Sequence, residues 1–384
     1  MSWYLDLLIK ENTMAESRVV PYWGNRQYNA TRTRVLLPNV MPVSTPYLVN
    51  IDPANVCNIK CQFCPTGHPE LLKKFDRPKG KMDFDLFCKV INDLTQFPER
   101  IKVLLLHKDG EPLLNPRIGD MLAYAKKSGV AEVIWLTTNM ILLTPKLVEE
   151  IIDSGIDFVR ASINHVSDEG YRNLTVNYSD YERVRRNTEM LFKEKERRGS
   201  HLKIWAKFNN FGMTDEEIAK FGRDFKDITD EHMLVNPMGW TYGQEFDFKL
   251  GFHPETGQEG AVPLKEGRVV CPYPFYRMVV NFNGDISVCE LDWTMTTVVG
   301  NAREEAMIDI WNGQRIHAFR LMQLEGRRWS HNACKQCSCV TYMPDENDMD
   351  AHQDRLLKLF YKLGPDAPAQ AWAMRQNGNW NDDA

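Results

Sequence analysis

Short apolar runs alternate with longer amphipathic segments between residues 48 and 235, and this alternation most strongly constrains the fold. The apolar runs have the length and composition of buried strands, whereas the segments between them have helical spacing. Strands that alternate with helices form parallel sheets of βα units. We therefore predict an α/β fold, a partial (β/α)6 barrel of the TIM type, with the strands YLVNID, IKVLLLH, EVIWLTT, FVRASIN, KIWAKF and MLVNP.

The pattern changes after residue 235. A stretch rich in glycine and polar residues predicts a linker or an active-site loop, and Asn283-Gly284 between two β-rich runs predicts a hairpin. A helical pattern follows at residues 306–326, and the acidic tail is predicted to form a peripheral helix plus disorder. The predicted organisation is an N-terminal extension (1–47), the barrel (48–235), the loop (236–270), a small C-terminal domain of hairpin and helix (271–343) and the tail (344–384).

Charge and hydropathy narrow the class of protein. The formal net charge of the 384 residues is -5, which does not suggest a polyanion partner such as nucleic acid. No apolar stretch approaches the ~18 residues of a membrane span, and the charged N-terminus does not have the pattern of a signal peptide. These features predict a cytoplasmic protein without membrane contact. In a reducing compartment, nine clustered cysteines favour metal ligation over disulfides.

Three of these cysteines, Cys57, Cys61 and Cys64, directly follow the first predicted strand. Function is expected at this end of the strands in a barrel of this type. Zinc prefers four ligands, whereas three thiolates can hold a [4Fe–4S] cluster and leave one iron open. A zinc site with a remote fourth ligand and a group of core thiols both remain as alternatives.

The C-x3-C-x2-C spacing, with Phe63 before the last cysteine, resembles the signature of the radical S-adenosylmethionine (SAM) superfamily. The resemblance implies a [4Fe–4S] cluster whose open iron is chelated by the amino and carboxylate groups of SAM. It also implies a flavodoxin- or ferredoxin-type electron donor, whose electron splits the sulfonium and gives a 5'-deoxyadenosyl radical.

Further short motifs at predicted strand ends match this family. Gly110-Glu111-Pro112 resembles the GGEP element that receives the methionine amino group, with Asp109 in place of the first glycine. Thr138-Asn139 resembles the TNG element, and Ser162 resembles a serine that hydrogen-bonds the ribose or the carboxylate. The SAM-binding residues implied by the resemblance are Phe63, Gly110, Glu111, Pro112, Asn139, Ser162 and Asn164.

A second set of four cysteines lies in the C-terminal region. Cys271 and Cys289 would be nearly ~60 Å apart on a straight strand, and the Asn-Gly turn brings them together. Cys334 and Cys337 supply two more thiolates, and such a set suits either zinc or a [4Fe–4S] cluster. The layout resembles the shortened "twitch" form of the SPASM extension, which implies one auxiliary [4Fe–4S] cluster and two clusters in total.

Two cysteines remain outside both sets. Cys88 has the spacing of a helix-core residue and is predicted to be a buried apolar side chain. Cys339 is predicted to be an inert neighbour, an alternative ligand to Cys337, or a hydrogen-atom donor near the substrate.

An auxiliary cluster that is fully ligated by protein is suited to electron transfer, and the chain has no GxGxxG motif for a dinucleotide. We therefore expect a radical SAM oxidoreductase that abstracts hydrogen from a carbinol carbon of a sugar, aminoglycoside or cyclitol. The auxiliary cluster then accepts an electron and a ketone forms. The alternatives are a radical epimerase with Cys339 or another thiol as hydrogen donor, a peptide-modifying enzyme and a zinc-bearing scaffold protein.

The substrate residues are predicted from position alone. The candidate bases or cations near the hydroxyl are Lys108, Asp109, Arg277, Glu290 and Asp292. Each of these residues is also compatible with an ordinary salt bridge. Trp240 and Tyr242 are candidates for a sugar-binding surface, or for ordinary core positions.

Overall fold

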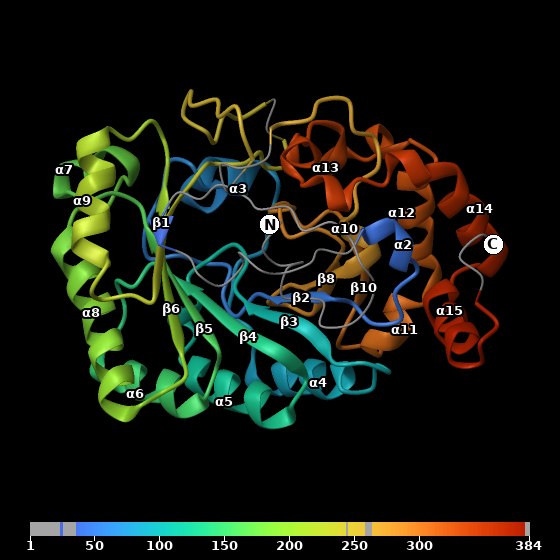
Figure 1. The fold of residues 1–384 in the computed structure, drawn as a ribbon, viewed down its shortest axis with the longest axis horizontal. Helices are drawn as coiled ribbons and strands as arrows, with labels where there is room; N and C mark the ends of the chain where they lie inside the picture. Colours follow the sequence, from blue (N-terminus) through green and yellow to red (C-terminus); the bar gives the residue numbers. More distant parts are fainter. Residues whose placement is uncertain (1–23, 26–35, 243–244, 258–262, 381–384) are drawn as a thin grey trace.

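The computed structural model describes residues 24–25, 36–242, 245–257 and 263–380, and it is built on one ten-stranded sheet (Figure 1). Six parallel strands form its centre and correspond to the six predicted strands. Each of these strands pairs with the next one in chain order. Together they form an open barrel. Their bounds are β2 Leu48–Ile51, β3 Ile101–Leu106, β4 Ala131–Thr138, β5 Phe158–Ile163, β6 Lys203–Asn209 and β7 Glu231–Val235.

Helices cover the outer face of this sheet (Figure 1). Asp83 accepts a hydrogen bond from the N–H of Leu86 at the start of α4, and Thr214 forms a capping box with Glu217 at the start of α9. Three of the helices end at a left-handed glycine. These helices are α4 Phe84–Leu94, α5 Ile118–Ser128, α6 Pro145–Ser154, α8 Tyr181–Arg198 and α9 Asp215–Phe225.

The inner face of the sheet is apolar at one end and polar at the other. Trp135 of β4 and Trp205 of β6 pack edge to face, with ring centroids 5.6 Å apart, and Arg160 of β5 lies over both rings. Side chains alternate along a strand, so residues two and four positions further on face the same interior. These later positions lie at the carboxyl ends of the strands, where the polar residues gather.

The C-terminal region extends the barrel sheet. Helix α10 (Tyr273–Tyr276) leads into β8 (Arg277–Val280), which pairs in parallel with β2, so that Leu48 lies opposite Arg277. The predicted hairpin is confirmed, because β8 pairs antiparallel with β9 (Asp285–Ser287) and Gly284 adopts φ +98° at the turn. Strand β10 (Val298–Asn301) completes the edge. The sequence did not predict that this region would join the barrel sheet.

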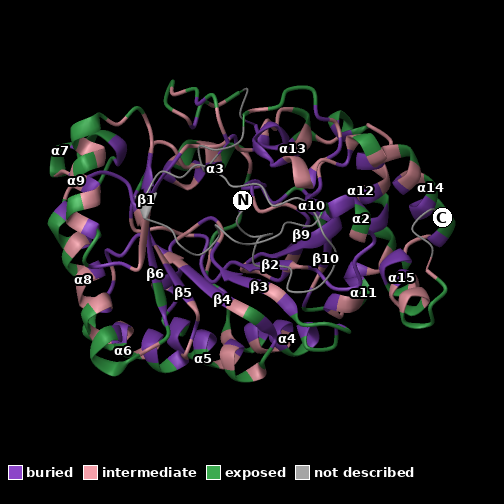
Figure 2. Cartoon of the chain, viewed as in Figure 1, coloured by how far each residue is buried: buried purple, intermediate pink, exposed green. Residues whose placement is uncertain are grey.

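The predicted helix at 306–326 is two helices, and the tail is more ordered than predicted. Gly313 separates the helices, and the disorder expected in the tail is replaced by a second packed helix. Phe360 packs against Phe275 and His317, and this contact buries the tail against the C-terminal region (Figure 2). These helices are α11 Met307–Trp311, α12 Gln314–Leu324, α13 Asn332–Lys335, α14 Gln353–Leu363 and α15 Ala367–Gln376.

Three short helices occupy other connections: α2 Leu37–Val40, α3 Pro69–Lys74 and α7 Asp168–Leu174. A two-residue strand, β1 Gly24–Asn25, pairs antiparallel with β7 at the far edge of the sheet. Within the described ranges, every helix is too short or too polar to cross a membrane.

Candidate functional site

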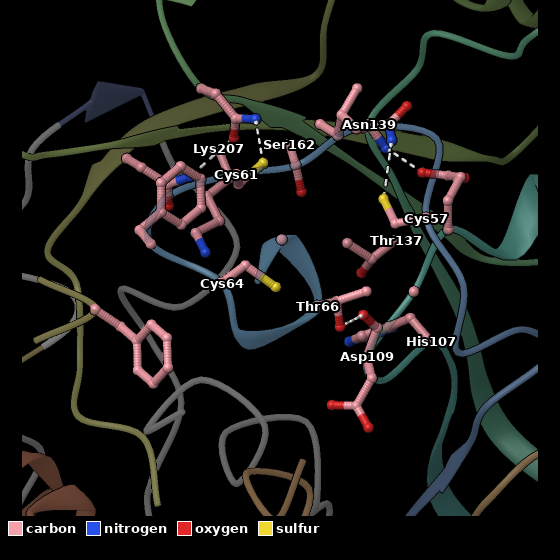
Figure 3. A pocket seen from close by; sticks show the side chains of 18 of the residues that line it. Cys57, Cys61, Cys64, Thr66, His107, Asp109, Thr137, Asn139, Ser162 and Lys207 are labelled. Carbon is pink, nitrogen blue, oxygen red and sulfur yellow. Dashed lines mark hydrogen bonds between the residues drawn. The ribbon is translucent and has the colours of Figure 1, made fainter. Parts of the chain in front are cut away.

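A cavity of about 270 Å³ opens at the carboxyl ends of the parallel strands (Figure 3). The cysteine loop that follows β2 forms one wall, and the ends of β3 to β6 form the floor. Trp240 and Phe248, from the predicted loop, also line the cavity. Of the predicted cluster and SAM-binding residues, those that line this cavity are Cys57, Cys61, Phe63, Cys64, Gly110, Glu111, Asn139, Ser162 and Asn164.

Two glycines allow the cysteine loop to pack closely against its neighbours. A Cβ atom on Gly67 would lie 2.2 Å from the carbonyl oxygen of Cys61. A Cβ atom on Gly110 would lie 2.1 Å from the carbonyl oxygen of Ala54 and 2.4 Å from that of Val56. Backbone atoms cannot yield easily to such contacts, so the glycine of the GEP element fixes the position of the loop that carries Cys57.

We expect Gly110→Ala to displace the cysteine loop. The new methyl group would collide with two backbone carbonyls, and the protein reconstituted under anaerobic conditions should lose most of the iron bound near Cys57. Gly222→Ala is the matched control, because its Cβ would meet nothing within 4 Å and the position lies in helix α9. Full iron content in Gly110→Ala, measured per protein chain, would show that this close packing is not needed.

The three thiols near the cavity fit an iron–sulfur cluster. Burial raises the pKa of Cys57 to about 12, and burial also raises the pKa of Cys61 and Cys64, so positive charge is needed to keep them as thiolates. Side-chain amides face two of the sulfurs, with Asn164 Nδ2 3.5 Å from Cys61 Sγ and Asn139 Nδ2 3.9 Å from Cys57 Sγ. N–H groups directed at cluster sulfurs are a common way to tune such centres.

The same thiols are not gathered as ligands of one ion. Throughout the described part of the chain, no three His, Cys, Asp or Glu side chains converge closely enough to hold a single metal ion. Cys57, Cys61 and Cys64 are instead arranged around the cavity wall (Figure 3). This arrangement and the soft sulfur donors fit a centre with several irons.

Glu111 connects two strand ends beneath the cysteines. Its carboxylate accepts hydrogen bonds from the N–H of Leu113, the hydroxyl of Thr138 and the N–H of Asn139. Burial raises its pKa to about 7 despite these donors. Pro112 begins a short 3-10 turn and is not among the residues that line the cavity. Binding of the SAM amino group by these residues remains a prediction.

The charged residues predicted near the substrate are already paired with one another. Lys108 forms an ion pair with Asp109, which also pairs with Arg77 at 3.1 Å, and Lys108 donates to the carbonyl of Asp292. Arg277 is fully buried and forms an ion pair with Glu290. Lys108, Asp109 and Glu290 line the cavity, whereas Arg277 and Asp292 do not.

The contacts of Asp292 and of the two aromatic candidates indicate what each residue does. The Asp292 carboxylate accepts the N–H groups of Thr296 and Thr297 and the hydroxyl of Thr294, which fits a structural role in the loop before β10. Trp240 lines the cavity, whereas Tyr242 belongs to an aromatic cluster with Trp293.

The cavity also contains basic residues that were not singled out from the sequence: His107, Arg160 and Lys207. Arg160 and Lys207 lie inside runs that are otherwise apolar. Buried parallel strands are usually continuous apolar runs, so a charged side chain in such a strand was an available signal. Period-two alternation places Lys207 on the same face as Trp205 and Asn209.

The second cysteine set consists of Cys271, Cys289, Cys334 and Cys337. Burial, followed by repulsion from other thiols of the set, raises the pKa of Cys271, Cys289 and Cys334. Ligation of a cluster by these four thiols remains a prediction. Gln323 helps to hold them, since its side-chain oxygen accepts the N–H of Cys271 at 3.2 Å. These four thiols come from the residues before α10, after β9, within α13 and after α13.

Cys339 lies behind the second set. Its N–H is 3.4 Å from Cys337 Sγ, its thiol donates to the Tyr273 hydroxyl at 3.5 Å, and it is not among the residues that line the cavity. Hydrogen bonding from Cys339 lowers the pKa of Cys337. Cys88 is half-buried on α4, apart from both sets.

The two cysteine sets share one wall. Glu290 and Leu291 line the cavity that contains Cys57, Cys61 and Cys64, and they directly follow Cys289 of the second set. The β8–β9 hairpin therefore places the second set next to the space where a small molecule could bind.

Comparisons with known protein families match both regions. The profile described as the radical SAM superfamily matches residues 51–222, and the SPASM profile, described as an iron–sulfur cluster-binding domain, matches residues 271–338.

Two curated relatives differ in how much of each chain aligns. The chain is 24% identical over 317 residues to a tungsten-containing aldehyde ferredoxin oxidoreductase cofactor-modifying protein of Pyrococcus furiosus, with 73% of this chain and 84% of the relative covered. It is 33% identical over 76 residues to an S-adenosyl-L-methionine-dependent 2-deoxy-scyllo-inosamine dehydrogenase of Niallia circulans, with 20% of this chain and 30% of the relative covered.

A solved structure resembles the chain at the level of fold. Streptococcus suis SuiB bound to the precursor peptide SuiA superimposes with a TM-score of 0.55 at 15% sequence identity, with 84% of this chain and 74% of that chain covered.

Proposed function

Because the chain belongs to the radical SAM superfamily and carries a SPASM cluster-binding domain, we propose that it oxidises a secondary alcohol to a ketone. The proposed substrate is a small sugar, aminoglycoside or cyclitol. The cofactors are SAM and two [4Fe–4S] clusters.

The proposal rests on the position of the second cysteine set, which lies next to the cavity that contains the first set. When bound, SAM supplies a radical that abstracts hydrogen, and the second cluster supplies a one-electron acceptor. Glu290 and Leu291 line the cavity and directly follow Cys289 in the chain, so a substrate in the cavity would lie near that acceptor. Cys57, Cys61 and Cys64 would hold the first cluster, and Cys271, Cys289, Cys334 and Cys337 the second.

The lining of the cavity suits a small polyol. The hydroxyl of Thr137 and the amides of Asn209 and Asn236 can exchange hydrogen bonds with hydroxyl groups, and the ring of Trp240 offers an aromatic face. The Niallia circulans relative is named as a 2-deoxy-scyllo-inosamine dehydrogenase, and this similarity supports the same substrate class.

The proposal also includes an electron donor, and the positions of the thiols bear on the epimerase alternative. Reductive cleavage of SAM requires a low-potential electron, which we assign to a flavodoxin- or ferredoxin-type donor in the cytoplasm. Of the thiols in the described part of the chain, Cys57, Cys61 and Cys64 line the cavity, and Cys339 does not. The epimerase alternative is therefore less well supported.

A second candidate function comes from the longer curated match. The Pyrococcus furiosus relative is named as a cofactor-modifying protein, and 84% of its length aligns with this chain. The second candidate is therefore radical modification of a cofactor, with the same SAM site and the same auxiliary cluster.

An anaerobic assay with a defined substrate panel tests the proposal. The reconstituted protein, SAM and dithionite would be incubated separately with myo-inositol, 2-deoxy-scyllo-inosamine, glucosamine and glucose 6-phosphate. We expect one of these classes to yield a product about two daltons lighter that reacts with a carbonyl reagent. Retention of substrate mass with deuterium gained from D2O would contradict oxidation and favour epimerisation. Absence of any product across the panel would favour the cofactor-modifying candidate.

A further inference from the structure

The proposed oxidation needs a group that accepts the proton of the substrate hydroxyl. The four cavity or near-cavity candidates taken from the sequence are paired with one another, Lys108 with Asp109 and Arg277 with Glu290. Each of these groups already has an oppositely charged partner. A proton acceptor is better provided by a group without such a partner.

Lys207 is such a group. It lies on β6, and its Cα is paired in register with that of Ser162 on β5, so both side chains face the cavity (Figure 3). No described residue forms a hydrogen bond or an ion pair with its amine. Its position two residues beyond Trp205 places it above the aromatic floor of the barrel.

The charges around Lys207 come from several elements. Arg160 on β5 repels it, His107 directly after β3 lies near Arg160 with the nitrogens 3.4 Å apart, and Glu290 after β9 attracts it. The residue in register on β7 is the apolar Met233, while Glu231 of that strand lies opposite Trp205. Of these groups, Arg160 acts on the amine more strongly by repulsion than Glu290 does by attraction.

These surroundings favour the neutral amine. Burial, followed by repulsion from Arg160, lowers the pKa of Lys207 to about 7, against the weaker attraction of Glu290. An ordinary lysine has a pKa near ~10.4 and is almost fully protonated at neutral pH. Arg160 itself is held over the rings of Trp135 and Trp205, which keeps its positive charge close to Lys207.

The geometry points to Lys207 as the residue that accepts the hydroxyl proton of the substrate, an inference that rests on the proposed function. When bound, SAM would supply the acceptor for the hydrogen atom of the carbinol carbon, and the second cluster would supply the acceptor for one electron. The O–H bond of the substrate breaks, and its proton forms an N–H bond at Nζ of Lys207. Loss of the remaining unpaired electron to that acceptor would leave a C–O double bond. Lys207 later returns the proton to solvent.

The variants Lys207→Arg and Lys207→Ala test whether Lys207 acts as a base or only supplies a positive charge. Arginine keeps the positive charge but does not lose its proton, so both variants should form ketone about 100-fold more slowly than the wild type. Methylamine should restore part of the rate in Lys207→Ala. Lys203→Ala is the matched control, since this residue lies on the same strand, is exposed and pairs with Asp230. All variants should retain wild-type iron content and SAM affinity.

The pH dependence provides a second readout. The lowered pKa means that the neutral base form is available above about pH 7, so the wild-type rate of ketone formation should rise up to that region and then level off. The variants should lose this rise. Wild-type activity in Lys207→Arg would overturn the inference and assign the residue to binding of an anionic group. A weakened SAM affinity as the sole defect would overturn it in favour of cofactor binding.

A labelling experiment separates this inference from the proposed function. Acetic anhydride modifies neutral amines, and peptide mass spectrometry of the reconstituted protein without substrate would follow labelling of Lys207 against pH. Half-maximal labelling near pH 7 is expected. A midpoint near ~10.4 would overturn the inference, whatever the substrate. A midpoint near 7 in a protein that oxidises no alcohol would refute the proposed function alone.

Discussion

Replacing Cys57 by alanine is expected to abolish the cleavage of SAM to 5'-deoxyadenosine. The three thiols of Cys57, Cys61 and Cys64 surround one cavity, and the remaining two cannot complete the ligand set of a cluster with one open iron. Anaerobic reconstitution of Cys57→Ala should incorporate about half of the wild-type iron, and no 5'-deoxyadenosine should be detected by liquid chromatography after addition of dithionite.

Cys88→Ala is the matched control for this experiment, because Cys88 is half-buried on α4 and lies apart from both cysteine sets. It should retain full iron content and SAM cleavage. Unimpaired formation of 5'-deoxyadenosine by Cys57→Ala would show that the first cluster is held elsewhere.

Replacing Cys289 by alanine should have a different consequence. The second cluster should be lost, since Cys289 is one of its four proposed ligands and interacts electrostatically with the other three thiols. SAM cleavage should continue, because the first cysteine set is unchanged, but ketone formation should fall by two orders of magnitude or more without the electron acceptor. The measurement is the ratio of ketone to 5'-deoxyadenosine, with Cys88→Ala again as the control.

A wild-type ratio in Cys289→Ala would contradict the role of the second cluster as electron acceptor. Loss of both products would instead indicate that the hairpin carrying Cys289 stabilises the barrel, since β8 pairs directly with β2. Iron analysis and the thermal unfolding midpoint of the variant distinguish these two outcomes.

Local patterns predicted the barrel well. The apolar runs coincide with β2 to β7, and the capped amphipathic segments coincide with the outer helices, since strand alternation and helix caps are short-range features. The pairing of β8 with β2 was not predictable in the same way. Leu48 and Arg277 are far apart in sequence, and nothing in either segment specifies its partner.

Only part of the candidate site could be predicted from the sequence. The cysteines and the SAM motifs follow strand ends, so their convergence follows from the parallel sheet. The ion pairs of Lys108 with Asp109 and Arg277 with Glu290 depend on tertiary contacts and changed the interpretation of those residues. Lys207 was overlooked because it lies within a strand, although a lysine in an apolar run was a usable signal.

The tail was predicted in part. The expected helix is present as α14, where Leu356, Leu359, Phe360 and Leu363 recur at helical spacing and form a buried stripe. The acidic composition suggested disorder beyond it, where a second helix, α15, forms instead. Periodicity was the better guide here, because a single apolar face suffices to dock a helix.

The central claim is that Cys57, Cys61 and Cys64 hold a [4Fe–4S] cluster whose open iron binds SAM in the cavity. Electron–nuclear double resonance on the reduced protein with SAM carrying ¹⁵N in its amino group tests this directly. The account predicts a hyperfine coupling between the cluster spin and that nitrogen, which disappears in Cys57→Ala. A reconstituted wild-type protein that contains zinc without iron, or a reduced cluster that shows no coupling to the labelled nitrogen, would contradict it.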